Sequence, residues 1–308
     1  MDGPGRTSVT SVPTRLGPLR VETAGAGPPA VLWHSLFVDS TTWARVREPL
    51  ASVRRLLLVD GPGHGHNPPV ARRFTLDDCA GAATDVLDHF RIGGPADWVG
   101  NAWGGHVGVP FAAAYPGRCR SLATIGSPVH ALTPPERRKI ALLSRVYRLT
   151  GPLPPLVNLL TDALLGPGAR AADPEAAAVV GSAFRRARRR GMAGAIRSVS
   201  LHRPDLTPLL TTISAPVLIC AAADDPSWTP ADAASAASRL PNGAPVILPG
   251  SGHIAPLFEA APALVDMLTA FWADPAAVIT RHRADATTPA PARRQPDSQH
   301  RASRSISR

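Results

Sequence analysis

Cysteine is scarce in this 308-residue chain, which carries only Cys79, Cys119 and Cys220. They are odd in number, widely spaced and set among apolar residues, so no disulfide framework is predicted and the thiols are expected to lie buried in a reducing compartment. No apolar run approaches the roughly 20 residues that span a bilayer, and residues 1–15 lack the apolar centre of a signal peptide. The sequence therefore predicts a cytoplasmic protein without a membrane partner.

Lysine and aromatic residues are also rare. Lys139 is the only lysine, aromatics make up 5% of the chain, and the formal charge of +10 comes from arginine. Much of the excess lies at residues 184–190 and beyond residue 281, with no aromatic side chains between the arginines to stack on bases. We expect no specific nucleic-acid partner, and the Ala, Pro, Ser and Arg composition of residues 275–308 predicts a disordered basic tail. The oligomeric state cannot be read from the sequence.

Short apolar runs rich in β-formers recur along the chain, with helical patterns such as residues 76–90 and 105–116 between them. Strands that are apolar on both faces belong to a sheet covered by helices on both sides, so the alternation predicts an α/β fold with a mostly parallel, doubly wound sheet. The six predicted strands are residues 28–34, 54–60, 96–101, 120–126, 215–223 and 244–250.

The alternation stops at about residue 130 and resumes at about residue 213. Gly and Pro separate four helical patterns in this stretch, which predicts a helical insertion between two strands. The expected organisation is a flexible N-terminus (1–15), a core formed by residues 16–129 and 213–274, and the insertion at 130–212.

The stretch "VGNAWGG" carries a strand into a helix through a very short turn at Ala102. Glycines on both sides allow neighbouring backbone segments to approach closely, as a strained strand-to-helix turn requires. The central side chain of such a turn stands above the carboxyl edge of the sheet, where ligands bind in folds of this kind. We therefore predict a functional site around Ala102.

Three further stretches carry polar groups after predicted strands. The turn "HSLFVDSTTW" can offer the backbone N–H of Leu36 to a developing oxyanion, and Trp103, which follows Ala102, can offer a second. Asp224 and Asp225 follow a late strand and can orient an imidazole, and His253 lies on a Gly-rich loop before the last helix.

The order turn, acid, histidine resembles that of the α/β-hydrolase superfamily over about residues 16–274. The stretch "VDGPGHGHNPP" (59–69) also resembles the D-x-P-G-H-G-x-S turn of that family, and residues 34–43 resemble the oxyanion segment of its esterase and lactonase branches. The resemblance implies an α/β-hydrolase fold in which residues 130–212 form a helical lid.

The resemblance also implies roles for single residues. His253 would be the base and Asp225 its acid, with Asp224 as a rival, and the N–H groups of Leu36 and Trp103 would bind the oxyanion. The side chains expected to line the substrate pocket are those of His34, Ser35, Asn101, His130 and Trp228.

The chain departs from the family at the nucleophile position, where Ala102 replaces Ser, Cys or Asp. A methyl group cannot attack, so covalent catalysis at this position is excluded. Three explanations stay open: a hydrolase of a small hydrophobic ester, lactone or related carbonyl compound that uses His253 and Asp225 without a serine, a non-catalytic binder of a small apolar ligand, and an engineered Ser-to-Ala esterase. No cofactor is expected. No metal is expected either, because His64 and His66 lack a third ligand nearby.

Overall fold

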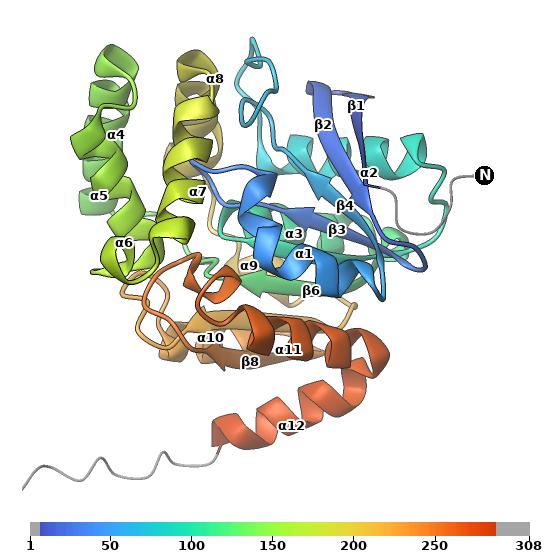
Figure 1. Cartoon of the computed structure of the whole chain (residues 1–308). Coiled ribbons are helices and arrows are strands. Elements are labelled where there is room, and N and C mark those ends of the chain that lie inside the picture. Colours follow the sequence, from blue (N-terminus) through green and yellow to red (C-terminus); the bar gives the residue numbers. More distant parts are fainter. Residues whose placement is uncertain (1–6, 288–308) are drawn as a thin grey trace, which may run out of the picture.

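The computed structural model describes residues 7–287, which form an eight-stranded sheet in the order β1-β2-β4-β3-β5-β6-β7-β8 (Figure 1). β1 and β2 pair antiparallel, as do β2 and β4, and all other neighbours are parallel. The predicted α/β-hydrolase fold class is confirmed. The strands are β1 (Ser8–Thr14), β2 (Gly17–Ala24), β3 (Pro29–Trp33), β4 (Arg55–Val59), β5 (Ala96–Asn101), β6 (Cys119–Ile125), β7 (Val217–Ala222) and β8 (Gly243–Leu248).

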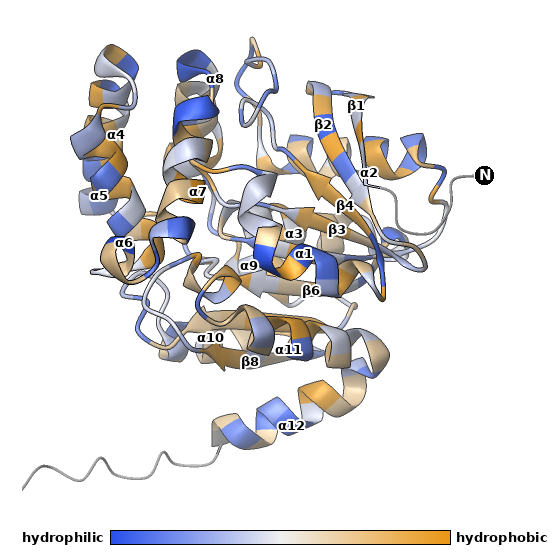
Figure 2. Cartoon of the chain, in the orientation of Figure 1, coloured by the Kyte–Doolittle hydropathy of each residue, from blue (hydrophilic) through white to orange (hydrophobic). Residues whose placement is uncertain are grey.

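Helices cover both faces of this sheet, which is why its central strands are almost uniformly apolar (Figure 2). Side chains alternate between the faces, so that Val31 and Trp33 of β3 join one core cluster and Ala30 and Leu32 join the other. The first cluster includes residues of α2 (Leu76–His89), α3 (Trp103–Ala114) and α10 (Pro230–Ala237). The second includes residues of α1 (Ala44–Ala51), α11 (Ala261–Ala273) and α12 (Pro275–Thr287).

Residues 130–212, here called the helical insert, lie between β6 and β7 and fold into helices, as their pattern predicts. Two ion pairs fasten helix α7 to the core, one between Arg186 and Asp39 at 2.8 Å and one between Arg45 and Asp173 at 2.5 Å. Its elements are α4 (Pro134–Thr150), α5 (Pro154–Leu165), α6 (Ala169–Ala172), α7 (Pro174–Arg186), α8 (Arg189–Ala195), a π-helix (Ile196–Leu201) and α9 (Thr207–Leu210).

Two predicted boundaries are wrong. Residues 8–14 of the expected flexible N-terminus form β1, which pairs with β2 along its whole length and buries Val12. Residues 275–287 of the expected disordered tail form α12, because Val278 and Ile279 bury their side chains and Arg283 donates a hydrogen bond to the Gly243 carbonyl at 2.7 Å. Residues 1–6 and 288–308 lie outside the described residues. None of the helices within residues 7–287 is long and apolar enough to cross a membrane.

A buried carboxylate joins several strands at the end of the sheet opposite the site. The side chain of Asp97 is 1% exposed and accepts hydrogen bonds from Arg54 Nε at 2.8 Å and from Ser121 Oγ at 2.7 Å. The guanidinium of Arg54 in turn lies over the ring of Trp272, 4.8 Å from its centroid. The carboxylate of Asp97 therefore connects β5 to β6 directly, and through Arg54 it also connects the start of β4 and helix α11.

Removal of this carboxylate is expected to be costly. Asp97→Ala leaves the largely buried Arg54 without its partner, so the free energy of unfolding should fall by about 3–5 kcal/mol in urea denaturation. Asp88→Ala is the matched control, because Asp88 is 63% exposed and pairs with Arg118 at the surface; its loss should cost less than about 1 kcal/mol. Equal effects of the two substitutions would contradict the role given to Asp97.

Candidate active site

Ala102 lies in a sharp turn between β5 and α3, with φ of +46° and ψ of −104°. This conformation is rare for a residue with a side chain and costs on the order of 1–3 kcal/mol. The surroundings enforce it: the Ala102 amide donates to the Ile125 carbonyl at 2.8 Å. A Cβ at Gly100 would collide with the backbone of Gly104, and a Cβ at Gly104 would collide with the Trp33 carbonyl. The turn is thus held by close backbone packing.

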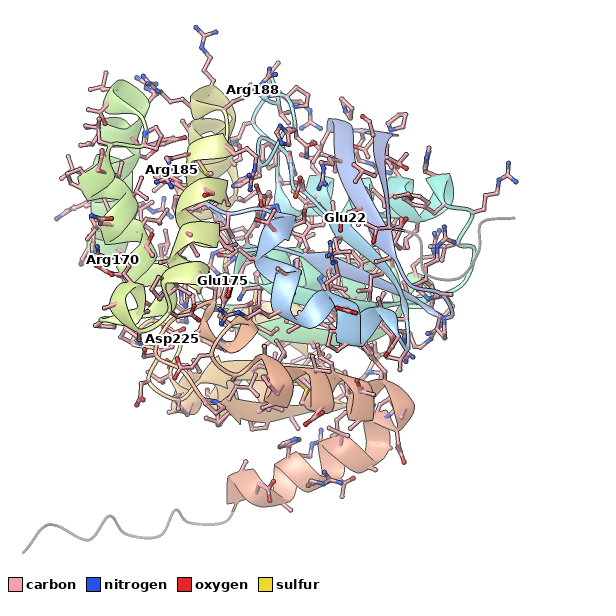
Figure 3. All side chains as sticks on the ribbon, viewed as in Figure 1. Glu22, Arg170, Glu175, Arg185, Arg188 and Asp225 are labelled. Atoms are coloured by element: carbon pink, nitrogen blue, oxygen red, sulfur yellow. The ribbon has the colours of Figure 1, made fainter. Side chains whose placement is uncertain are left out.

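His253 and Asp225 form a hydrogen-bonded pair. Nδ1 of His253 lies 2.5 Å from Oδ2 of Asp225, whose side chain is 1% exposed against 22% for the histidine. The other carboxylate oxygen accepts the Ser227 amide at 2.8 Å, which fixes the orientation of Asp225. Within residues 7–287, Nε2 of His253 has no recorded hydrogen-bond partner. The pair lies on the side of the molecule that carries the helical insert (Figure 3).

Asp224, the rival acid, has an exposed side chain, and its amide donates to the Gly250 carbonyl at 3.0 Å. Its carboxylate makes no recorded contact with His253 among the described residues. The structure therefore pairs the histidine with Asp225, the acid that the family resemblance implies.

Asn101 connects the histidine loop to the turn. Its Nδ2 donates to the Ile125 carbonyl at 3.0 Å and to the His253 carbonyl at 2.9 Å. The loop also lies close to Gly126, where a Cβ would come within 2.6 Å of the His253 carbonyl oxygen. Asn101 was expected to line the substrate pocket. Its side chain is instead fully buried, and its two hydrogen bonds are those of a positioning residue.

His34 and Ser35 are also buried and face inwards. Nδ1 of His34 donates to the Ser35 carbonyl at 2.7 Å, and its Nε2 accepts the Gly61 amide at 2.8 Å. The hydroxyl of Ser35 donates to the Leu36 carbonyl at 3.2 Å. Both side chains are bonded to backbone groups, those of residues 35, 36 and 61, so their observed contacts are structural.

A second buried histidine, His64, supports the same turn. Its Nδ1 donates to the Pro62 carbonyl at 3.1 Å and its Nε2 accepts the Phe37 amide at 3.3 Å. Phe37 has φ of +76°.

The amide of Leu36, one of the two expected oxyanion donors, has no recorded acceptor within residues 7–287. The amide of Trp103 belongs to the first turn of α3 and has no partner within that helix. Among the described residues, neither of the two expected oxyanion donors therefore has a recorded acceptor.

Burial keeps the two histidines neutral. Burial lowers the pKa of His34, and it lowers the pKa of His64 from 6.5 to about 3. Since an acceptor nitrogen must be unprotonated, both rings need the neutral form to hold the Gly61 and Phe37 amides. Protonation of either ring would break a hydrogen bond that shapes the turn around Leu36.

The model of the alpha/beta hydrolase family matches residues 30–267 of the chain. The chain belongs to this family. Its sequence is 39% identical over 110 residues to a pimeloyl-[acyl-carrier protein] methyl ester esterase of Chromobacterium violaceum, a match that covers 35% of this chain and 41% of the relative. It is 34% identical over 108 residues to a 2-hydroxymuconate semialdehyde hydrolase of a Pseudomonas species, with coverage of 34% and 38%. These matches span less than half the length of the curated relatives.

Solved structures share the fold of this α/β-hydrolase at lower identity. The enol-lactonase from Burkholderia xenovorans LB400 aligns with a TM-score of 0.77 at 23% identity, covering 87% of this chain and 100% of the other. A thermophilic esterase from Thermogutta terrifontis aligns with a TM-score of 0.74 at 23% identity, covering 86% and 98%.

His130 and Trp228 are the remaining predicted pocket residues of this α/β-hydrolase. His130 is exposed, Trp228 is 1% exposed, and their ring centroids are 6.0 Å apart. Trp228 is therefore largely a packing residue. Within residues 7–287 no cluster of three or more metal-ligating side chains is found, and the imidazole of His64 is held by backbone while His66 is exposed.

Sequence reasoning missed an apolar cavity of about 200 Å³ between the helical insert and the turn that follows β3. Phe37 contributes from that turn, and its ring packs edge-on against Phe184 of α7 with centroids 6.2 Å apart. In the sequence, the spacing of Ile140, Leu143 and Tyr147 predicts one apolar face of a helix. It does not indicate which segment that face packs against. The full lining is Phe37, Lys139, Ile140, Leu143, Ser144, Tyr147, Leu156, Leu159, Leu160, Ala163, Phe184 and Ile196.

The strain at Ala102 can be measured. Ala102→Gly removes the Cβ from a positive-φ position and should raise the free energy of unfolding by up to about 1 kcal/mol. The same substitution at Ala178, an exposed residue in the middle of α7, should lower it by about 0.5–1 kcal/mol because glycine weakens a helix interior. Urea denaturation of both variants checks the opposite signs, and a loss of stability in Ala102→Gly would contradict the strain.

The neutral histidines predict a pH dependence. His64 contributes stability that is complete above pH 6.5 and is lost as the pH falls toward 3, because only the unfolded chain binds the proton readily. The free energy of unfolding should drop by about 1.4 kcal/mol per pH unit from this group, and His64→Gln should remove that part of the slope between pH 7 and pH 5.

His66→Gln controls for the loss of an imidazole, since His66 is exposed two residues away. Denaturation at several pH values measures the slopes, and equal slopes in the parent and His64→Gln would contradict the buried neutral state.

Proposed function

We propose that this α/β-hydrolase hydrolyses a small hydrophobic ester, lactone or related carbonyl compound with His253 as general base and without a covalent intermediate. The observation that carries the proposal is the 2.5 Å hydrogen bond between His253 Nδ1 and the buried Asp225. A carboxylate on Nδ1 holds the ring in the tautomer whose Nε2 can accept a proton. Because Ala102 stands where the family's nucleophile would be, the attacking group is water.

The proposed reaction has two proton transfers. His253 Nε2 takes a proton from water as its oxygen attacks the carbonyl carbon, and the amides of Leu36 and Trp103 stabilise the resulting oxyanion. The tetrahedral intermediate then collapses, and the leaving alkoxide receives the proton from Nε2. Each group returns to its starting state, and no cofactor is required.

The substrate class rests on the cavity and on the relatives. In this proposal the helical insert is the lid, and its cavity of about 200 Å³ is nearly all apolar side chains, which suits a small hydrophobic group. The named relatives include a methyl ester esterase and an enol-lactonase, enzymes of esters and lactones respectively.

The same cavity favours a second candidate function, which is binding without turnover. A protein that lacks a nucleophile but keeps an apolar cavity next to the turn at residues 34–37 can hold a small apolar ligand. The third explanation from the sequence, an esterase with its serine replaced, predicts that a serine at position 102 restores full activity.

His253→Ala distinguishes the catalytic from the binding function. The turnover of p-nitrophenyl butyrate and of a small lactone should fall at least about 100-fold, the usual contribution of a general base. His89→Ala is the matched control, because exposed histidines also hydrolyse activated esters and His89 is exposed at the end of α2. Equal rates in the parent and His253→Ala would refute the catalytic proposal and favour the binder.

Ala102→Ser tests the geometry of the turn. The serine variant should be labelled by a fluorophosphonate and release product in a burst, whereas the parent should show neither, because only a serine at this position gives an acyl-enzyme. Labelling of the parent would reveal another nucleophile, such as Ser35, and would contradict the proposed water attack.

A further inference from the structure

Helix α4 of the insert turns an apolar stripe to solvent. Leu142, Val146 and Leu149 follow the i, i+4, i+7 spacing that places residues on one face of a helix, and Leu142 and Leu149 are 63% and 75% exposed. Leu153, just before α5, and Leu159 within it are exposed as well. We call these five residues the outer insert face. Figure 2 shows apolar residues along α4 and α5 at the edge of the molecule.

This concentration is specific to the insert. Among the described residues, seven large apolar side chains are exposed, and five of them form the outer insert face while the others are Val9 and Ile247. Scattered apolar residues are ordinary on a protein surface, whereas a stripe such as Leu142, Val146 and Leu149 along one face of a helix is typical of an interaction site.

Basic residues surround the outer insert face. Arg138, Lys139, Arg145 and Arg148 lie exposed on α4 itself, where the only acidic residue, Glu136, caps the start of the helix. No ion pair is recorded for these four cations within the part of the chain that the structure describes. An apolar stripe flanked by unpaired cations is typical of helices that lie on anionic lipid surfaces.

We call Arg138, Lys139, Arg145 and Arg148 the basic collar. Further arginines extend it onto a neighbouring helix. Arg189 at the start of α8 donates to the carbonyl of Leu149 at 3.1 Å, which brings α8 to the end of α4. Arg188 and Arg190 on either side are exposed, and Arg188 points away from the body of the molecule at the outer end of the insert (Figure 3). The exposed leucine at the end of α4 and the arginines at the start of α8 therefore lie next to each other.

The cavity of the insert adjoins this face. Leu159 lines the cavity and is 52% exposed, and the exposed Lys139 also lines it. Its volume of about 200 Å³ is below the roughly 300–1,000 Å³ of most drug-sized ligand sites, which suits a single aliphatic chain.

We propose that the outer insert face docks on the surface of an anionic lipid bilayer, with its leucines in the interface and its arginines on the lipid phosphates. Guanidinium groups bind phosphate with paired hydrogen bonds, which supports this assignment. A second copy of the chain is disfavoured as the occupant, because two basic collars would face each other. The absence of a membrane-spanning segment predicted no membrane partner, but surface docking needs no such segment. The proposal does not depend on whether His253 is catalytic.

Co-sedimentation with vesicles tests the docking. The full chain should bind phosphatidylcholine vesicles that contain phosphatidylglycerol, bind poorly to pure phosphatidylcholine, and be released by high salt, since salt screens surface charge. Leu142→Asn with Leu149→Asn, and separately Arg138→Glu with Arg145→Glu, should each weaken binding at least about tenfold.

The controls are Val9→Asn, another exposed apolar residue, on β1, and Arg239→Glu, an exposed arginine after α10. Both should bind like the parent. The basic residues beyond 287 are the same in every variant, so their attraction to lipid cancels in the comparison. Equal melting temperatures confirm that the variants remain folded, because the substituted side chains are exposed.

Several results would overturn the proposal. Parent-like binding by both double variants, or equal binding to neutral and anionic vesicles, would remove the assigned role of the face. A dimer in sedimentation velocity that Leu142→Asn with Leu149→Asn abolishes would assign the face to a second copy. Retention on immobilised poly-glutamate without vesicle binding would assign it to an acidic protein.

Discussion

The carbonyl oxygen of Ile125 is the point on which the candidate site depends. It accepts the Ala102 amide at 2.8 Å, Asn101 Nδ2 at 3.0 Å and Ser127 Oγ at 3.0 Å. These bonds hold the sharp turn at the edge of the sheet, and Asn101 extends them to the loop of His253. The histidine and the turn come from distant parts of the chain, so their common attachment to the end of β6 is what makes one site of them.

The strained turn persists although its side chain is a methyl group. The positive φ at Ala102 costs conformational free energy. The close packing of Gly100 against Gly104, and of Gly104 against the Trp33 carbonyl, nevertheless holds the backbone in this conformation. Packing of the sheet against α3 therefore maintains the geometry independently of catalysis. The proposed chemistry depends on the imidazole of His253, whose Nδ1 is paired with the buried carboxylate of Asp225 and whose Nε2 has no recorded partner among the described residues.

The helical insert has two distinct faces, one that lines a cavity and one that meets solvent. Its inner face closes an apolar cavity over Phe37, next to the proposed oxyanion turn, and its outer face presents leucines within a basic collar. The ion pairs of α7 with Asp39 and Arg45 fix this insert to the segment that follows the turn. The helices that carry the outer face are thus joined by ion pairs to the segment next to the candidate site.

The sequence by itself determined the six parallel strands β3 to β8, the turn at Ala102 and the order of acid and histidine, because periodicity and glycine spacing act over a few residues. Tertiary structure decided between Asp224 and Asp225, turned His34 inwards, and ordered residues 8–14 and 275–287. It also decided which face of α4 meets solvent. These outcomes depend on which distant segments come into contact, and local patterns of residues carry no record of that.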